Sequence, residues 1–474
     1  MQATQTKEMP QARVKIAHPN LAILGLMIGS FVGMFSETAL NIALPSLMTA
    51  LHVTQGTVQW LVTGYMLVIG ICMPLSSLIT KWFTTKRIVL FALGAFMLGA
   101  LISALASAFP MVLLGRMMQG IGTGVVLPLM FSVALQIFPS YKLGTIMGLA
   151  SLVIMVAPAV GPTITGLILA KLTWHYIFGL FVPVLVLAFV LTEIGLDNIY
   201  PQTKTPVDWL SIVTSTIGFA GIVMGASMAS DLGWLSWQVL VALLIGIIAL
   251  VVYARRQLQL PQPMLNLKIF KTKQFTVGTL LVMLDFGIIL ASMYLLPMYL
   301  QRVLGLPVAL TGIVMLPGGV MNAVVSAIAG RLYDSHGAKW LARGGFLIAG
   351  IGALCLFFSN AHSSIAWLIF GHVVLMIGAP LAMSPVQTYG LSSLKGATSA
   401  DGSAVMNTLQ QVVGAVSTAI ATSLIAMGSA RQVGVAGLTS GTHAGFMFVL
   451  ILVVIALIIT SQIKNVQQHA AEPH

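Results

Sequence analysis

Fourteen apolar stretches, each about long enough to cross a lipid bilayer, dominate this chain of 474 residues. A helix needs about 20 mostly apolar residues to span the hydrocarbon core. The stretches lie at 21–44, 58–79, 88–108, 111–135, 146–170, 175–195, 209–229, 236–254, 275–300, 309–331, 340–359, 365–390, 404–427 and 443–462. Their apolar residues are continuous rather than alternating, which excludes a transmembrane β-barrel. The sequence therefore predicts an all-α integral membrane protein with 14 transmembrane helices.

The charge content supports this prediction. Only 7% of the residues are charged, against about 25% in an ordinary soluble domain. The net charge of +12 is scattered between the apolar stretches and not gathered in one segment, so we expect no nucleic-acid partner. Cys72 and Cys355 both lie in apolar runs, which indicates neither a disulfide framework nor a metal site.

The basic residues predict the orientation of the chain. With the N-terminus in the cytoplasm, the tails and inward loops hold eighteen of the 22 Lys and Arg residues. The outward loops hold only Lys171, Arg302 and Arg431, and Arg116 lies within a span. This asymmetry follows the positive-inside rule. We therefore expect a multi-pass protein of the plasma membrane, acting as a monomer, with both termini in the cytoplasm.

The two ends of the chain repeat one pattern. Glu37 is followed by Pro45 in the first span, and Asp285 by Pro297 in the ninth, so that the acids are 248 and the prolines 252 residues apart. Transporters are often built from such repeats, with the substrate path between them. The expected organisation is a tail (1–20), an N-terminal six-helix bundle (21–200), two inserted helices (201–260), a C-terminal six-helix bundle (261–463) and a second tail (464–474).

Two carboxyl groups are the main candidates for chemistry. Of the ten acidic residues, only Glu37 and Asp285 fall well inside apolar spans. A buried, unpaired carboxylate is costly, so such a group faces a cavity, finds a partner or takes up a proton. Either carboxyl can therefore carry a proton or attract a cationic substrate. The alternative is a structural carboxyl that is hydrogen-bonded to a neighbouring helix.

Further polar residues within the spans complete the candidate site. Arg116 is permanently charged and therefore needs partners inside the membrane. We expect helix 1 to be its neighbour, so that Arg116 pairs with Glu37 or tunes it. The alternative is that Arg116 anchors the orientation of its helix near the outer end. Pro158 and Pro162 weaken the fifth span and Gly161 belongs to a stripe of small residues on it, so that this segment can bend or slide against the other half. Candidates for contact with substrate are Glu37, Asp285, Asn41, Gln59, Tyr65, Tyr294, Gln410 and Gln411, although such aromatic residues are more often simple packing.

Several motifs together resemble the major facilitator superfamily, specifically its fourteen-helix drug:H⁺ antiporters. They are "SETALNIALP" (36–45), "GRMMQGIGTG" (115–124), "APAVGPTITG" (157–166) and "DGSAVMNTLQQVVGA" (401–415). The resemblance implies a role in proton transfer for Arg116 and a conformational role for Gly161 and Pro162. It also places Glu37 where the helix 1 motif has Asp or another residue.

The chain departs from the family after its second span. There the usual glycines and acid are replaced by Ser76, Thr80 and Phe83-Thr84, whereas the copy after the tenth span keeps Gly330, Arg331 and Asp334. A charge lock, meaning a set of charged residues that holds the cytoplasmic side closed, must therefore depend on the second half of the chain.

These observations predict a proton-coupled antiporter that exports hydrophobic, cationic compounds by alternating access. We find no G-x-x-x-x-G-K-[ST] loop, so an ion gradient would supply the energy. Substrates, protons and the lipid bilayer are the expected partners. No metal site, cofactor or enzymatic residue set is indicated. The alternatives are an exporter of one specific metabolite or lipid with the same fold, and a membrane sensor or scaffold that transports nothing.

Overall fold

The computed structural model describes residues 16–138, 140–199, 202, 208–261, 263–394 and 397–463, and most of both expected tails lies outside these ranges. Within them the regular structure is helical, with no strand. A helix satisfies its backbone hydrogen bonds internally, as a segment in lipid must. The helices are α1 (Pro19–Leu51), α2 (Gln55–Trp82), α3 (Thr85–Ala104), α4 (Phe109–Ile137), α5 (Ser140–Leu169), α6 (His175–Gly195), α7 (Trp209–Leu232), α8 (Trp237–Gln259), the 3-10 helix η1 (Leu267–Lys271), α9 (Lys273–Arg302), α10 (Val308–Phe357), α11 (Ile365–Ser392), α12 (Ala397–Arg431) and α13 (Val435–Thr460).

Among the described residues, 13 helical segments are long and apolar enough to cross a membrane, and α5 contributes a shorter apolar segment, Val156–Leu169. Each of these segments overlaps one of the fourteen predicted stretches, which confirms the expected all-α membrane fold. The stretches 309–331 and 340–359 share one element, α10, which contains a kink at Gly337. Gly337 has φ 71°, a left-handed conformation that glycine adopts without steric cost. The expected loop between these two stretches is thus reduced to a turn at one residue.

Short caps begin several of the helices. The hydroxyl of Thr54 accepts a hydrogen bond from the Thr57 backbone N–H at 3.1 Å where α2 begins. Ser364 does the same for Trp367 at the start of α11, at 3.2 Å. Such side chains satisfy donors that the first helical turn leaves free. They therefore stabilise the first turns of α2 and α11.

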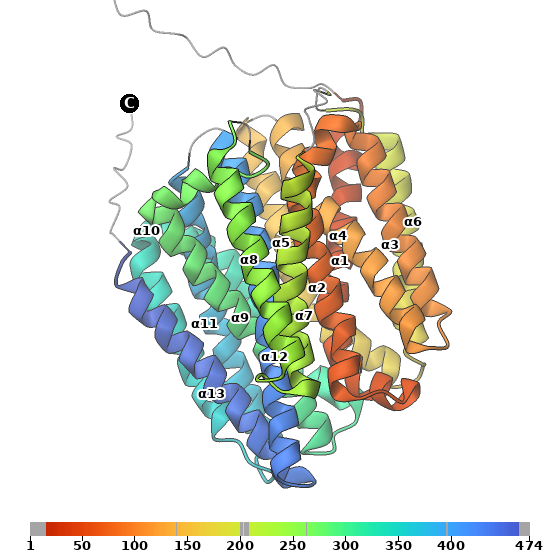
Figure 1. Ribbon diagram of the computed structural model, residues 1–474, viewed down its shortest axis with the longest axis vertical. Coiled ribbons are helices and arrows are strands. Elements are labelled where there is room, and N and C mark those ends of the chain that lie inside the picture. The colour runs from red at the N-terminus through yellow and green to blue at the C-terminus, as the bar shows by residue number, and fades with distance from the viewer. Residues whose placement is uncertain are drawn as a thin grey trace, which may run out of the picture.

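The helices form two groups (Figure 1). α1 to α6 pack mainly on one another and are called the N-terminal bundle; α9 to α13 are called the C-terminal bundle. α7 and α8 pack side by side, and α7 contacts both α2 and α12. The proximal face is the one where α1 begins at Pro19, and the distal face is the one where α1 ends at Leu51.

A polar cluster at the proximal end holds α7 and α8 together. Arg256 on α8 donates two hydrogen bonds to the Asp208 carboxylate, at 2.7 and 2.8 Å. This bidentate contact lowers the pKa of Asp208 to about 2. Gln257 donates to Ser211 on α7 and accepts from the backbone N–H of Leu265, which leads toward α9. The cluster therefore joins the inserted helices to the start of the C-terminal bundle.

Candidate transport site

Arg116 lies on α4 in the core of the N-terminal bundle and is fully buried. Its Nε donates to the backbone oxygen of Leu61 at 2.9 Å, and its Nη1 donates to Gln119 Oε1 at 2.8 Å. Nη1 also donates to the hydroxyl of Ser36 on α1, while Nη2 has no partner. The guanidinium is therefore held by neutral oxygens from three helices, and this geometry brings Arg116 to helix 1 as the sequence predicts.

Tyr65 on α2 belongs to the same network. The guanidinium carbon of Arg116 lies 3.9 Å from the centre of the Tyr65 ring, a cation–π contact. The Tyr65 hydroxyl donates to the Gly33 backbone oxygen at 2.8 Å and lies 2.7 Å from the hydroxyl of Thr123. The ring and hydroxyl of Tyr65 thus support Arg116 and α1. A direct contact with substrate stays a prediction.

Glu37 is 1% exposed near the middle of α1, directly after the Ser36 that binds Arg116. Neither carboxyl oxygen has a hydrogen-bond partner. Arg116 acts on Glu37 through its charge, but the two form no ion pair. The side chain of Gln411, on α12 of the other bundle, lies within hydrogen-bonding reach of the Glu37 carboxyl. Glu37 therefore lies where the N-terminal bundle faces α12.

The predicted amide side chains are all buried. Asn41, Gln59, Gln410 and Gln411 are 2, 1, 6 and 4% exposed, respectively. The side-chain oxygens of Asn41 and Gln411 have no hydrogen-bond partner, nor does either polar atom of the Gln59 amide. Asn41, Gln59 and Gln411 therefore retain unused hydrogen-bonding capacity inside the protein.

Asp285 is fully buried on α9 of the C-terminal bundle. Its two carboxyl oxygens have no hydrogen-bond partner, and no described charged group acts on it appreciably. A charge in such surroundings is costly, and protonation removes it. Asp285 thus differs from Glu37, which has Arg116 nearby.

Two hydrogen bonds join the bundles near the distal face. Gln55 on α2 donates to the Tyr294 hydroxyl on α9 at 3.0 Å. Gln301, at the end of α9, donates to the Ile42 backbone oxygen on α1 at 3.1 Å. Tyr294 therefore lies at the contact between bundles, where α9 meets α2.

α5 and α10 make a close contact that also joins the bundles. Thr163 donates to the Gly312 backbone oxygen at 3.1 Å, and a Cβ at Gly312 would lie 3.0 Å from the Pro162 oxygen. Gly161 faces α1 instead, where a Cβ would lie 2.6 Å from the Thr38 hydroxyl oxygen. Pro162 thus lies at the contact between bundles, and Gly161 within the N-terminal bundle.

The predicted charge lock after the tenth span is described only in part. Gly330 lies in α10, where a Cβ would be 4.0 Å from the Ser384 hydroxyl oxygen on α11. The side chains of Arg331 and Asp334 lie outside the described residues.

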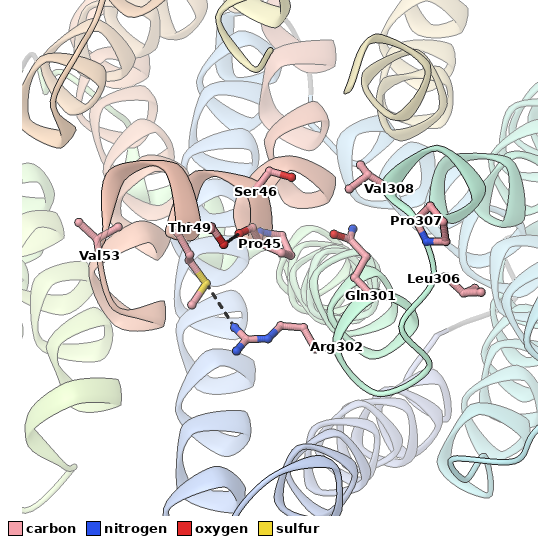
Figure 2. A pocket seen from close by; sticks show the side chains of 10 residues that line it. Pro45, Ser46, Thr49, Val53, Gln301, Arg302, Leu306, Pro307 and Val308 are labelled. Atoms are coloured by element: carbon pink, nitrogen blue, oxygen red, sulfur yellow. Dashed lines mark hydrogen bonds between the residues drawn. The ribbon is translucent and has the colours of Figure 1, made fainter. Parts of the chain in front are cut away.

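A pocket of about 540 Å³ opens at the distal face between the bundles (Figure 2). It lies between the end of α1 and the connection from α9 to α10, and Arg302 reaches across to Met48 Sδ at 3.7 Å. None of the predicted site residues lines it. The lining residues are Pro45, Ser46, Met48, Thr49, Val53, Gln301, Arg302, Leu306, Pro307 and Val308.

The sequence interpretation missed part of the Arg116 network. Ser36 and Thr123 were not singled out, although both are buried and bonded within it. Arg116, Gln119 and Thr123 are spaced by three and four residues, which places them on one helix face. This polar stripe on α4 was one signal in the sequence that could have revealed the network. The hydroxyl of Ser36, next to Glu37, was a second one.

Comparison with known proteins identifies the family. The model of the Major Facilitator Superfamily matches residues 26–418. The chain belongs to the major facilitator superfamily. It is therefore a multi-pass membrane transporter and not an enzyme, and the fold of two six-helix bundles with two inserted helices is confirmed.

Among members of the superfamily, this chain is similar to transporters linked to drug resistance. It is 45% identical over 460 residues to the lincomycin resistance protein LmrB of Bacillus subtilis, covering 94% of this chain and 96% of that protein. The LmrB of Listeria monocytogenes is 43% identical over 453 residues, with the same coverage. A peptide transporter POT crystal structure with sulfate gives a TM-score of 0.66 at 17% identity, covering 93% of this chain and 94% of that one, a likeness of fold.

Proposed function

We propose that this major facilitator exports antibiotics and other toxic, cationic compounds from the cell in exchange for protons. The observation that carries the proposal is a pair of buried carboxyls without hydrogen-bond partners, Glu37 in one bundle and Asp285 in the other. A carboxyl of this kind can be neutralised by a proton or by a cationic substrate, but not by both at once. This competition supplies the coupling of antiport.

The surroundings of the two carboxyls support different roles. Asp285 has no nearby described charge to balance its own, so the proton is its natural partner. Glu37 lies beside the Arg116 network and near Gln411, at the contact between bundles. We therefore assign proton carriage to Asp285, and substrate contact with a shared role in coupling to Glu37.

Drug export is further supported by the LmrB relatives, whose names refer to lincomycin resistance. Alternating access would separate the bundles where Gln55 meets Tyr294 and where α5 crosses α10. In this proposal the protein acts as a monomer in the plasma membrane, with the proximal face and both termini in the cytoplasm. The boundaries that the sequence predicts for the two tails, the two bundles and the two inserted helices are part of the same proposal.

Proteoliposomes test the proposal. Addition of lincomycin or tetraphenylphosphonium should release protons from vesicles that contain the wild-type protein, detected with a pH-sensitive dye. Asp285→Asn should abolish proton release while still binding substrate, and Glu37→Gln should weaken binding as well. Glu193→Gln is the control, because Glu193 is exposed and pairs with Lys86 near the proximal end. Undiminished proton release by Asp285→Asn would exclude the assigned role.

A further inference from the structure

The distal contact between the bundles includes a methionine sulfur. Met48, in the last turn of α1, accepts a hydrogen bond through its Sδ from Nη1 of Arg302 at the end of α9, at 3.7 Å (Figure 2). Gln301, the preceding residue, donates to the Ile42 backbone oxygen at 3.1 Å. Two consecutive residues of α9 thus hold α1 before and after Pro45, one through a carbonyl oxygen and the other through a thioether.

The contact between Met48 and Arg302 is the weaker of the two. A thioether sulfur is a weak hydrogen-bond acceptor, whereas a backbone carbonyl oxygen is a strong one. Within the described residues, the Arg302 guanidinium has no other hydrogen-bond partner and takes part in neither of the two ion pairs. The guanidinium can therefore form a much stronger bond if a better acceptor replaces the sulfur.

The Met48 sulfur is also within reach of small molecules from the distal face. Met48 is half-buried and lines the pocket of about 540 Å³, beside the exposed Arg302. The sulfur of Met376 accepts a hydrogen bond too, from Asn322 at 3.5 Å, but Met376 is fully buried. Among the described methionines, Met48 alone combines a hydrogen-bonded sulfur with a place in the wall of this pocket.

Oxidation would give Arg302 the better acceptor. Hydrogen peroxide transfers one oxygen atom to a thioether: the sulfur lone pair forms the S–O bond, the O–O bond breaks, and water leaves. With an S–O bond of about 1.5 Å and an S–O···N angle of about 120°, the new oxygen would lie about 2.7 Å from Nη1, the length of a charge-assisted hydrogen bond. The present distance between sulfur and nitrogen therefore leaves room for the oxygen of a sulfoxide.

We propose that Met48 is an oxidation site, and that its sulfoxide binds Arg302 and holds the distal ends of α1 and α9 together. The oxidant is a peroxide, and a methionine sulfoxide reductase restores the thioether. The consequence for transport rests on the proposed function, because alternating access requires these two helix ends to part. Oxidation then slows transport without changing the buried carboxyls.

Hydrogen peroxide tests the proposal on the full-length protein in proteoliposomes. Peptide mass spectrometry should show one added oxygen atom on Met48. Hydrogen exchange of the backbone at 46–51 and proton release driven by tetraphenylphosphonium should both slow by about tenfold, the effect of one strong hydrogen bond. Treatment with a methionine sulfoxide reductase should restore both rates. Unchanged hydrogen exchange after oxidation of Met48 would overturn the proposal.

Two variants and a matched control separate Met48 from the other methionines. Met48→Leu keeps the side-chain volume but cannot form a sulfoxide, and Arg302→Leu removes the donor. Peroxide should therefore slow hydrogen exchange at 46–51 by less than about twofold in either variant. Met111→Leu is the control, because Met111 is 40% exposed at the start of α4, on the same face of the protein. It should respond to peroxide as the wild type does, and an equal response of Met48→Leu would contradict the proposal.

A variant that needs no oxidant gives a second test. Met48→Gln places an amide oxygen near the expected position of the sulfoxide oxygen. It should slow hydrogen exchange at 46–51 and proton release before any peroxide is added, and a second substitution, Arg302→Leu, should remove the effect. A double-mutant cycle measures this coupling, and additive effects of the two substitutions would count against a bond between these positions.

The outcomes also separate this inference from the proposed function. If the wild-type protein releases no protons on addition of tetraphenylphosphonium but oxidation still slows hydrogen exchange at 46–51, the proposed function fails and the oxidation site stands. If proton release is normal and peroxide slows it equally in the wild type and in Met48→Leu, the oxidation site fails and proton-coupled export stands.

Discussion

The guanidinium of Arg116 stacks on the ring of Tyr65, with 3.9 Å between the guanidinium carbon and the ring centre. The Tyr65 hydroxyl is in turn bonded to the backbone of Gly33, four residues before Glu37. One aromatic side chain thus connects the buried charge of α4 to the helix that carries a candidate coupling carboxyl. A shift of α1 would change the surroundings of Arg116 directly.

Replacement of Tyr65 separates the two parts of this contact. Tyr65→Phe keeps the ring under Arg116 but loses the hydroxyl bonds to Gly33 and Thr123, whereas Tyr65→Leu loses both. We expect a small loss of stability for Phe and a larger one for Leu, because a desolvated cation–π contact contributes about 2 kcal/mol. Proton release per substrate should fall only in Tyr65→Leu. Thermal unfolding and proteoliposome stoichiometry measure these effects, and identical behaviour of the two variants would argue against the ring contact.

A second prediction concerns the crossing of α5 and α10. Gly312→Leu should prevent the close approach of these helices, since even a Cβ there would lie 3.0 Å from the Pro162 oxygen. We expect loss of transport with the protein still inserted in the membrane. Labelling of Ser46→Cys in the distal pocket by an impermeant maleimide should become faster. Gly344→Leu is the control, because no atom lies within 4 Å of a Cβ at Gly344. Normal transport by Gly312→Leu would contradict the prediction.

The contact between Asp208 and Arg256 predicts a dependence of stability on pH. Arg256 lowers the pKa of Asp208 to about 2, below its value of about 3.9 in an unfolded chain. The contact therefore stabilises the protein fully above about pH 4, and this contribution is lost as the pH falls through about 2. Melting temperatures across this range should fall more for the wild type than for Asp208→Asn. The control is Asp197→Asn, at an exposed position; a parallel decline in all three proteins would refute the prediction.

A fourth prediction concerns His372, whose buried ring packs against Gly318 of α10. Neither ring nitrogen has a hydrogen-bond partner, so packing contacts hold the ring in place. Gly318→Ala should destabilise the protein by about 1–3 kcal/mol, because the added methyl group overpacks the contact. His372→Ala in the same chain should recover part of that loss by making room. A double-mutant cycle with thermal unfolding checks this, and additive effects would show that the two residues are not coupled.

The sequence was sufficient for the features that depend on composition along the chain. Apolar length located all fourteen stretches, and the rarity of buried charge selected Glu37, Asp285 and Arg116. The role of Tyr65 was not accessible, because an aromatic residue in an apolar helix gives no sign of what its ring faces. The turn at Gly337 could not be predicted for a related reason. A polar stretch between two apolar ones indicates a loop, whether or not its backbone stays helical. Contacts between the bundles depend on helix register, which hydropathy does not encode.

The two inserted helices, α7 and α8, form a hairpin that is hydrogen-bonded to the N-terminal bundle and to the segment that leads into the C-terminal bundle. The hydroxyl of Ser227 on α7 lies 3.3 Å from that of Thr63 on α2, and Gln257 on α8 holds the backbone that leads into α9. If the bundles rock against each other, the hairpin must be carried along or its contact with α2 must part. The outer side of α8 is apolar and exposed, with Leu244 at 58% and Ile248 at 54%. Each transport cycle would then move the apolar outer side of α8 through the surrounding lipid. The turnover rate would therefore depend on the viscosity and thickness of the bilayer.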